Sequence, residues 1–294
     1  METFEKLKED GMTYDEAMEF MLYNDVRNPS DSDLFIDKIY NESCIETMKR
    51  LPKNSIDCVI TSPFYNTNEK AGKSRTLQNT AGSKGYPYVR YDKFIDTMSD
   101  KEYEDFIVEC FNGFSKIVKK NGVVLWQVSY GVKGMQPLIN LMFNLSNRTE
   151  WTCVDEITWR KKTALPNNCS CNRLTRICEK VYVMCRKSEV KSFHTNKSVV
   201  SVRKTGQKSY ENITNYIEAA NNDGSNSLNK ATFSIELVEK LMNIYAPVGG
   251  AVYDPFMGTG TTAVACKLNF RNYCGSEISE AQCKYANERL DNIE

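Results

Sequence analysis

The chain has 294 residues, enough for one large domain or two small ones, and 41% of them are apolar, which excludes a globally disordered protein. Its 38 Lys and Arg residues balance 38 Asp and Glu residues, so a nucleic-acid interface would have to be a local basic face. The charged first ten residues lack the apolar core of a signal peptide, and no apolar run approaches the roughly 18 residues of a membrane span.

The 11 cysteines are scattered and odd in number, which is typical of a reduced protein without disulfides. The tightest cluster is Cys169, Cys171 and Cys178, and it lacks the paired spacing of zinc ligands. We therefore expect a cytoplasmic protein with no membrane segment and no metal site.

Predicted strands and helices alternate along most of the chain. The first part predicts one or two short helices at 3–24, a strand at 34–40, a helix at 43–50 and a buried strand at 56–60. The middle predicts a helix at 100–119 ended by Asn121-Gly122, a strand at 123–128, a helix at 135–146, and strands at 154–159 and 180–185. The last part predicts a helix at 234–245, a strand closing at Tyr253, a helix, a strand ending at Glu277, and a helix at 279–291. This alternation predicts an α/β protein with a mostly parallel sheet.

Two polar stretches interrupt the pattern. Residues 66–92 are rich in Asn, Gly, Lys, Ser and Thr, and basic residues there alternate with tyrosines. Residues 187–230 are also polar and carry several Lys and Arg residues. Long loops in compact domains are usually functional or disordered, so each stretch is a candidate binding loop or a solvated insertion.

A glycine loop follows the strand that closes at Tyr253. Gly258 and Gly260 allow a tight turn and let the backbone lie against a ligand, although a purely structural turn is the alternative. Glu277, at the end of the next strand, is where an acid would accept hydrogen bonds from both ribose hydroxyls. Asp254 is placed to hold backbone amides of the loop or to meet a cationic group of the cofactor. An acid there disfavours a pyrophosphate and suits a cation, so the loop favours S-adenosylmethionine over NAD. An NAD oxidoreductase is also disfavoured because no obvious proton donor lies near the glycine loop.

The segment Ser62-Pro63-Phe64-Tyr65 follows the buried strand 56–60. Ligands collect beyond the carboxyl ends of parallel strands, although a rigid strand-to-loop turn is the alternative for this segment alone.

Taken together, these segments resemble the β-class amino-methyltransferases of restriction-modification systems and phages. That class carries a D/N/S-P-P-Y/F catalytic motif early and D-P-F-x-G-x-G-T late, matched here by Ser62–Tyr65 and Asp254–Thr261. Its I-x-W-x-K, P, R-x-T, E pattern is matched by Ile157, Trp159, Lys161, Pro166, Arg173, Thr175 and Glu179. The resemblance covers about residues 34–186 and 231–291.

The resemblance implies a Rossmann-like methyltransferase fold with S-adenosylmethionine as cofactor. The sheet would be seven-stranded, with helices on both faces, permuted motif order and a small target-recognition insertion. The implied divisions are a helical N-terminal extension at 1–33, a catalytic half at 34–186 with a DNA-facing loop at 66–92, a target-recognition region at 187–230 and a cofactor-binding half at 231–294.

The implied site residues fall into three groups. The catalytic ones are Ser62, Pro63, Phe64 and Tyr65. The cofactor-binding ones are Asp254, Pro255, Phe256, Gly258, Gly260, Thr261, Thr262, Glu277, Phe233 and Glu42, where a helix cap at Glu42-Ser43 is an equal alternative. The DNA-binding ones are Lys73, Arg75, Lys84, Arg90, Lys161, Arg173, Arg203 and Lys204.

The chemistry of an exocyclic base amine explains the catalytic residue types. Its lone pair is delocalised into the ring, so the Ser62 oxygen and the Pro63 carbonyl would each accept one amine hydrogen while Tyr65 stacks on the base. Such positioning suits direct SN2 transfer to a base flipped out of the duplex. Phe64 departs from the usual Pro of the motif.

Ser at the first motif position is commoner among N4-cytosine enzymes, so the sequence favours a site-specific cytosine-N4 methyltransferase of double-stranded DNA. An N6-adenine enzyme is the alternative. An RNA or protein-amine methyltransferase and a non-catalytic DNA-binding module of the same fold are less favoured. A cognate restriction endonuclease and a homodimer are the further partners that the resemblance suggests.

Overall fold

The computed structural model describes residues 35–66, 98–129, 134–163, 171–172, 174–223, 228–229 and 232–293, together with Gly11 and Thr13. The helices expected at 3–24 and nearly all of the loop expected at 66–92 lie outside these residues. None of the helices in the described ranges is long and apolar enough to cross a membrane.

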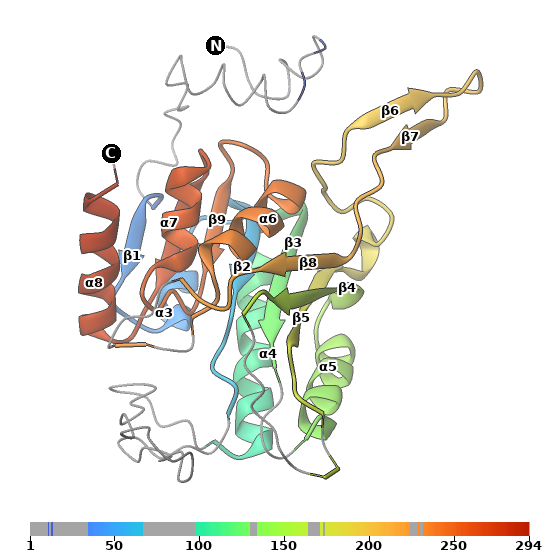
Figure 1. Cartoon of the computed structure of the whole chain (residues 1–294). Helices are drawn as coiled ribbons and strands as arrows, with labels where there is room; N and C mark the ends of the chain where they lie inside the picture. The colour runs from blue at the N-terminus through green and yellow to red at the C-terminus, as the bar shows by residue number, and fades with distance from the viewer. Residues whose placement is uncertain are drawn as a thin grey trace.

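One large sheet organises the described chain (Figure 1). Its strands lie in the order β1 (Lys38–Tyr40), β10 (Asn272–Ser276), β9 (Ala251–Asp254), β2 (Ile56–Thr61), β3 (Val118–Val128), β5 (Cys178–Arg186), β4 (Trp151–Lys161) and β8 (Tyr216–Ala219). All neighbours are parallel except β5, which runs antiparallel to both β3 and β4. The expectation of a mostly parallel Rossmann-like α/β sheet with permuted segment order is confirmed, because the C-terminal strands β9 and β10 lie between β1 and β2.

The sheet has eight strands in the described residues, where seven were expected. The extra strand is β8, which pairs with β4 and comes from the region expected to recognise DNA. Only Ile217 and Ala219 of its four residues are buried, a pattern too short to stand out in a polar stretch.

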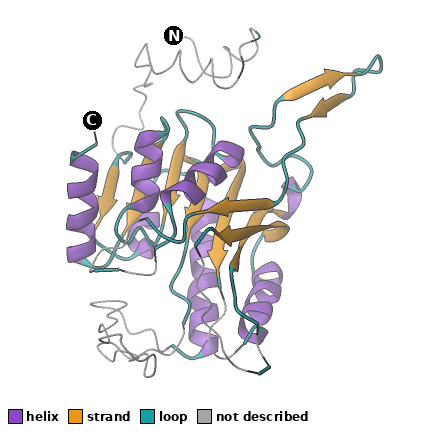
Figure 2. Ribbon diagram, viewed as in Figure 1, coloured by secondary structure: helices purple, strands orange, loops and turns teal. Residues whose placement is uncertain are grey.

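Helices cover both faces of the sheet (Figure 2). On one face, α3 (Cys44–Arg50), α4 (Asp100–Ile117) and α5 (Gln136–Arg148) share an apolar cluster with the strands. On the other face, α6 (Ile235–Tyr245), α7 (Thr261–Leu268) and α8 (Glu280–Asp291) contribute to a second cluster. Strand β3 contributes side chains to both clusters, because successive residues of a strand point to opposite faces. Val123 and Leu125 pack into the second cluster, and Val124 and Trp126 pack into the first.

The boundary between α4 and β3 differs from the prediction. The helix ends at Ile117 and β3 begins at once, so Asn121 and Gly122 lie inside the strand rather than ending the helix. The pairing with β2 shifts here, and Asn121 adopts a left-handed φ of 63°. A Cβ at Gly122 would lie 2.7 Å from the Asp57 carbonyl oxygen, so this irregularity needs glycine.

A separate hairpin of β6 (Val199–Val202) and β7 (Lys208–Tyr210) projects from the body of the molecule (Figure 1). It follows a short 3-10 helix, η2 (Lys187–Glu189), which comes directly after β5. In the described part of the stretch expected at 187–230, the regular structure consists of η2, the hairpin and β8.

Candidate active site

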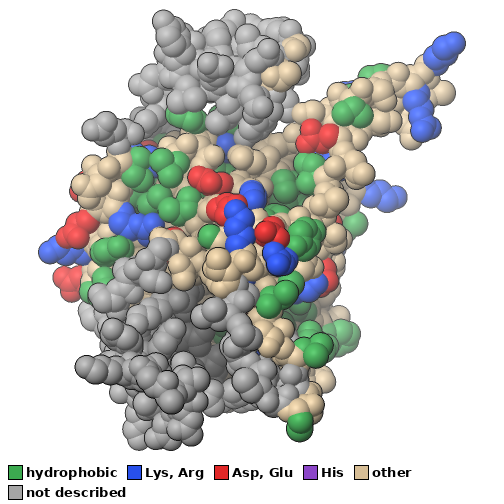
Figure 3. All heavy atoms as spheres, viewed as in Figure 1, with side chains coloured by type: hydrophobic (Ala, Val, Ile, Leu, Met, Phe, Trp, Pro, Cys, Tyr) green, Lys and Arg blue, Asp and Glu red, His purple; other side chains and the backbone are tan. Residues whose placement is uncertain are grey.

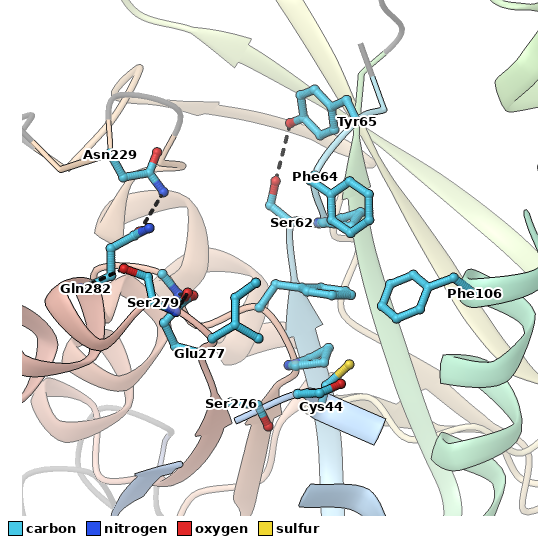
Figure 4. A pocket seen from close by; sticks show the side chains of 16 residues that line it. Cys44, Ser62, Phe64, Tyr65, Phe106, Asn229, Ser276, Glu277, Ser279 and Gln282 are labelled. Carbon is cyan, nitrogen blue, oxygen red and sulfur yellow. Dashed lines mark hydrogen bonds between the residues drawn. The ribbon is translucent and has the colours of Figure 1, made fainter. Parts of the chain in front are cut away.

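A pocket of about 920 Å³, counting its open mouth, lies beyond the carboxyl ends of β2, β9 and β10 (Figure 4). Because these strands are parallel neighbours, their ends meet at one edge of the sheet. Its lining residues are Ser43, Cys44, Ser62, Pro63, Phe64, Tyr65, Phe106, Asn229, Pro255, Phe256, Gly258, Ser276, Glu277, Ile278, Ser279 and Gln282. The segment predicted to be catalytic and the core of the predicted cofactor loop therefore share one cavity.

The glycine loop is fixed to the end of β10 by Glu277. The Gly258 backbone N–H donates to Glu277 Oε2 at 2.8 Å, and the Ser279 N–H donates to Glu277 Oε1 at 2.8 Å. Gly258 has a left-handed φ of 56°. Glu277 also lines the pocket, and a carboxylate oxygen is able to accept more than one hydrogen bond, so this side chain is a candidate acceptor for a ligand there.

Gly260 has a packing role. Its φ is 85°, and a Cβ there would lie 2.8 Å from the Cβ of Ala286 in α8. It does not line the pocket. The second glycine of the loop thus allows the start of α7 to approach α8.

Asp254 lies beneath the pocket and holds the loop. Its side chain is 1% exposed and accepts from Thr61 Oγ1 at 2.6 Å, from the Phe256 N–H at 3.0 Å and from Thr262 Oγ1 at 2.6 Å. Burial raises the pKa of this carboxyl to about 6, and the three donors partly offset that rise. Two roles were expected for Asp254, holding the loop and meeting a cationic group of the cofactor, and these hydrogen bonds match the first. Asp254 is absent from the pocket lining, so a direct contact with a cationic cofactor group is not supported.

Four more residues expected at the cofactor lie away from the pocket. The Thr262 hydroxyl donates to Asp254, the Thr261 hydroxyl donates to Asp223 at 2.6 Å, and Phe233 packs in the core. Glu42 accepts from Thr47 Oγ1 at 2.7 Å and from Arg50. Its neighbour Ser43 is the N-cap of α3, as the alternative for this position anticipated.

The predicted catalytic segment lines the opposite side of the pocket from Glu277 (Figure 4). Ser62 Oγ lies 3.3 Å from the Tyr65 hydroxyl, and that hydroxyl donates to Gln127 Oε1 at 2.9 Å. Ser62 and Tyr65 thus belong to one hydrogen-bonded unit at the end of β2.

Phe64, the departure from the motif, is a wall of the pocket. It is 7% exposed, and its ring centroid lies 5.2 Å from that of Tyr103 and 6.0 Å from that of Phe256, both in edge-to-face arrangements. The Tyr103 hydroxyl also donates to the Phe64 carbonyl at 2.7 Å. The aromatic side chain therefore ties the predicted catalytic segment to α4 and to the glycine loop.

The residues expected to bind DNA do not gather at one place in the described chain. Lys73, Arg75, Lys84, Arg90 and Arg173 lie outside the described residues. Lys161 Nζ donates to Glu179 Oε1 at 2.6 Å and lies 4.8 Å from the centre of the Trp159 ring, so it is held within the sheet. Arg203 and Lys204 are exposed at the turn between β6 and β7, and Figure 3 shows basic side chains at the far end of this hairpin.

Sequence reasoning missed several residues of the site. Asn229 donates through Nδ2 to Gln282 Oε1 at 3.2 Å, and both line the pocket from separate segments. The signal for Gln282 was present, because Ser279, two residues after Glu277, caps α8 and accepts from the backbone N–H of Gln282 in the first turn of the helix. Asn229 offered no such signal in its polar stretch.

The sequence and the fold of this chain are similar to those of DNA methyltransferases. The DNA methylase family model matches residues 56–288 of the chain. The type II methyltransferase M.HinfI of Haemophilus influenzae is 22% identical over 267 residues, covering 88% of this chain and 69% of that enzyme. Among solved structures, the cytosine-N4-specific PvuII DNA methyltransferase is 16% identical with a TM-score of 0.60, covering 87% of this chain and 88% of that one. The complex of M1.HpyAVI with SAM is 21% identical with a TM-score of 0.57, covering 86% of this chain and 98% of that one.

The similarity to the solved structures supports the fold assignment. The family match spans most of the chain, from the strand before Ser62 to the last helix. The chain belongs to the DNA methylase family that groups the N6 and N4 amino-methyltransferases.

Proposed function

We propose that this protein transfers a methyl group from S-adenosylmethionine to the exocyclic N4 amine of cytosine in double-stranded DNA. The observation that carries the proposal is the shared pocket. In it, Ser62, Pro63 and Tyr65 face a glycine loop and an acid, Glu277, across a pocket of about 920 Å³ that includes its open mouth. Membership of the DNA methylase family supports the reaction class.

The residues on the β9 and β10 side of the pocket fit S-adenosylmethionine. Gly258 presents backbone without a side chain, and Glu277 offers acceptor oxygens for ribose hydroxyls. The Phe256 ring provides an apolar surface beside them. When bound, this cofactor supplies a methyl group on a positively charged sulfur, which is an electrophile.

The residues on the β2 side fit a planar base with an exocyclic amine. Ser62 Oγ and the Pro63 carbonyl both accept hydrogen bonds, so the two amine hydrogens each have an acceptor. This arrangement draws the nitrogen toward a tetrahedral shape and frees its lone pair. Tyr65 and Phe64 supply aromatic surface for the base, which must leave the duplex to reach the pocket, at a cost of a few kcal/mol.

Serine at position 62 supports cytosine as the target base, and an N6-adenine enzyme is the second candidate. The direct test is mass spectrometry of nucleosides from duplex DNA incubated with the protein and S-adenosylmethionine, with duplex RNA in parallel. We expect 4-methylcytosine in the DNA sample alone. Detection of 6-methyladenine would replace the base assignment, methylated RNA would replace the substrate, and no methylated nucleoside would overturn the proposal.

A second test separates cofactor binding from methyl transfer. The variant Tyr65→Ala removes the ring expected to stack on the base and leaves the glycine loop untouched. We expect this variant to bind S-adenosylmethionine as tightly as the wild type, measured by calorimetry, and to lose most of its methyl transfer. Full activity in this variant would contradict the role given to Tyr65.

We also propose that the β6–β7 hairpin contacts DNA as part of the target-recognition region. Residues 197–210 contain Lys197, Arg203, Lys204 and Lys208 and no acidic residue, and two-stranded ribbons fit the major groove. Replacing Arg203 and Lys204 with Ala should raise the KM for DNA and lower its salt dependence, by about one unit of the log–log slope per lost phosphate contact. Unchanged KM and salt dependence would remove the hairpin from the interface. A partner endonuclease and a homodimer stay predictions.

A further inference from the structure

A line of hydrogen bonds leads from Ser62 away from the pocket, across β3 and β5, to β4. The Tyr65 hydroxyl lies 3.3 Å from Ser62 Oγ and donates to Gln127 Oε1 at 2.9 Å. Gln127 Nε2 donates to Glu179 Oε2 at 2.8 Å, and Glu179 Oε1 accepts from Lys161 Nζ at 2.6 Å. Only the first two residues of this line touch the pocket.

The middle of the line is buried, and its charged end is partly shielded from solvent. Gln127 is 3% exposed, and the side chains of Lys161 and Glu179 are 24% and 19% exposed. Lys161 also lies over the Trp159 ring, which fixes its stem. Hydrogen bonds to charged groups in such surroundings are stronger than those between neutral groups in water.

The charged end of the line sets the direction of every proton in it. An ionised Glu179 only accepts, so the Gln127 amide must turn its NH₂ toward Glu179 and its oxygen toward Tyr65. An amide oxygen only accepts, so the Tyr65 hydroxyl must donate to it. The Tyr65 oxygen then offers a lone pair to Ser62, and the Ser62 hydroxyl becomes the donor in their contact.

We propose that Glu179 and Gln127 are positioning residues that hold the Ser62 proton on Tyr65, so that Ser62 Oγ presents lone pairs to the target amine. The inference rests on the proposed function. A hydroxyl is both donor and acceptor, and a serine whose proton pointed at the amine would oppose the transfer. The line makes Ser62 Oγ act toward the target amine only as a hydrogen-bond acceptor, as a carboxylate oxygen at this position would. It also gives Lys161 a role inside the protein in place of the expected DNA contact, since Lys161 balances the charge of Glu179.

The test is a double-mutant comparison of Gln127→Leu in two backgrounds, measured as the single-turnover rate of methyl transfer to DNA. In the wild-type background this substitution frees the Tyr65 proton to turn toward Ser62, and we expect the rate to fall about tenfold or more. In the Ser62→Asp background there is no hydroxyl to orient, and we expect a change within about twofold. A merely structural role of Gln127 would reduce the rate equally in both backgrounds, and equal reduction would overturn the proposal.

A second comparison uses the far end of the line. Glu179→Gln introduces an NH₂ group that is able to donate to Gln127 and let its amide turn round, so kcat should fall while the KM for DNA and the cofactor affinity stay constant. The matched control is Glu156→Gln. Glu156 also pairs with a lysine across the β4–β5 ladder, Lys180 at 2.7 Å, but does not contact the line. Loss of kcat in both variants, or in neither, would contradict the proposal.

Failure of the inference is distinguishable from failure of the proposed function. If wild type and Gln127→Leu methylate DNA at the same rate while Tyr65→Ala is inactive, the enzyme assignment stands and the role of the line falls. A folded Ser62→Asp variant that binds cofactor yet transfers no methyl group would also overturn the inference, because an acceptor-only side chain is what it requires. If the wild type methylates no nucleic acid, the proposed function itself fails.

Discussion

Asp254→Asn removes a buried acid while keeping its shape, and the structure predicts how its effect depends on pH. Asp254 accepts hydrogen bonds from Thr61, Thr262 and the Phe256 N–H while only 1% exposed. Its pKa is raised from 3.8 to about 6, chiefly because burial disfavours the charged form. Since one pKa unit corresponds to 1.36 kcal/mol, this difference is worth about 3 kcal/mol.

The direction follows from proton binding. Between the two pKa values the folded protein binds more protons at this site than the unfolded chain, so the free energy of unfolding falls as the pH rises. The contribution of this carboxyl is complete below 3.8 and is lost above about 6. The variant does not ionise here, so its stability relative to the wild type should improve by about 3 kcal/mol between about pH 4 and pH 7.

Urea denaturation of both proteins across this pH range measures the difference. Thr262→Val serves as a second, nearly isosteric variant, because the Thr262 hydroxyl is the strongest group lowering the Asp254 pKa. Its loss should move the pH-dependent fall in stability to higher pH. A difference between the wild type and Asp254→Asn that stays constant with pH would refute the assignment of a raised pKa to this carboxyl.

Three further substitutions test the pocket and its support. Glu277→Gln replaces one of the two carboxylate oxygens that accept from backbone N–H groups, which costs about 1–3 kcal/mol. Calorimetry should show S-adenosylmethionine affinity weakened by about tenfold or more, and unchanged affinity would exclude Glu277 from the cofactor site. Gly260→Ala places a Cβ 2.8 Å from that of Ala286 at a φ of 85°, so thermal denaturation should show a lower Tm, and an unchanged Tm would show that α8 yields freely. Phe64→Ala empties an aromatic cluster and should lower the free energy of unfolding by about 3–5 kcal/mol; a loss under about 1 kcal/mol would mean that the cluster collapses to fill the space.

Contiguous features of the site were predictable from the sequence. The turn chemistry of Gly258 and the strand-end position of Ser62 to Tyr65 are local properties, and parallel strands bring such ends to one edge. The acid Glu277 was predictable because it ends the strand after the loop. These are the features that a single segment of chain encodes on its own.

Features made by side chains from separate strands were not predictable. Gln127 in β3 contacts Tyr65, and Glu179 in β5 contacts Gln127. Nothing in the local sequence of either residue predicts this register between the strands. The role of Asp254 was open between two functions, because whether a carboxylate points into a pocket or beneath it depends on packing around it. Strand β8 was missed for a related reason, since its pairing with β4 rather than its own four residues makes it a strand.

The position of β9 between β10 and β2 has a consequence for how the chain folds as it is made. The pairing of Cys58 with Val252 joins residues 194 positions apart in the sequence, and β1 reaches the sheet only through β10. Until β9 leaves the ribosome, one side of the already synthesised β2 therefore has no strand to pair with, and β1 has no neighbour at all. Such long-range parallel pairing is intrinsically slow, and an open edge invites association with other chains. The pocket lies at the carboxyl ends of β2, β9 and β10, so a nascent chain cannot complete it until β10 has been synthesised.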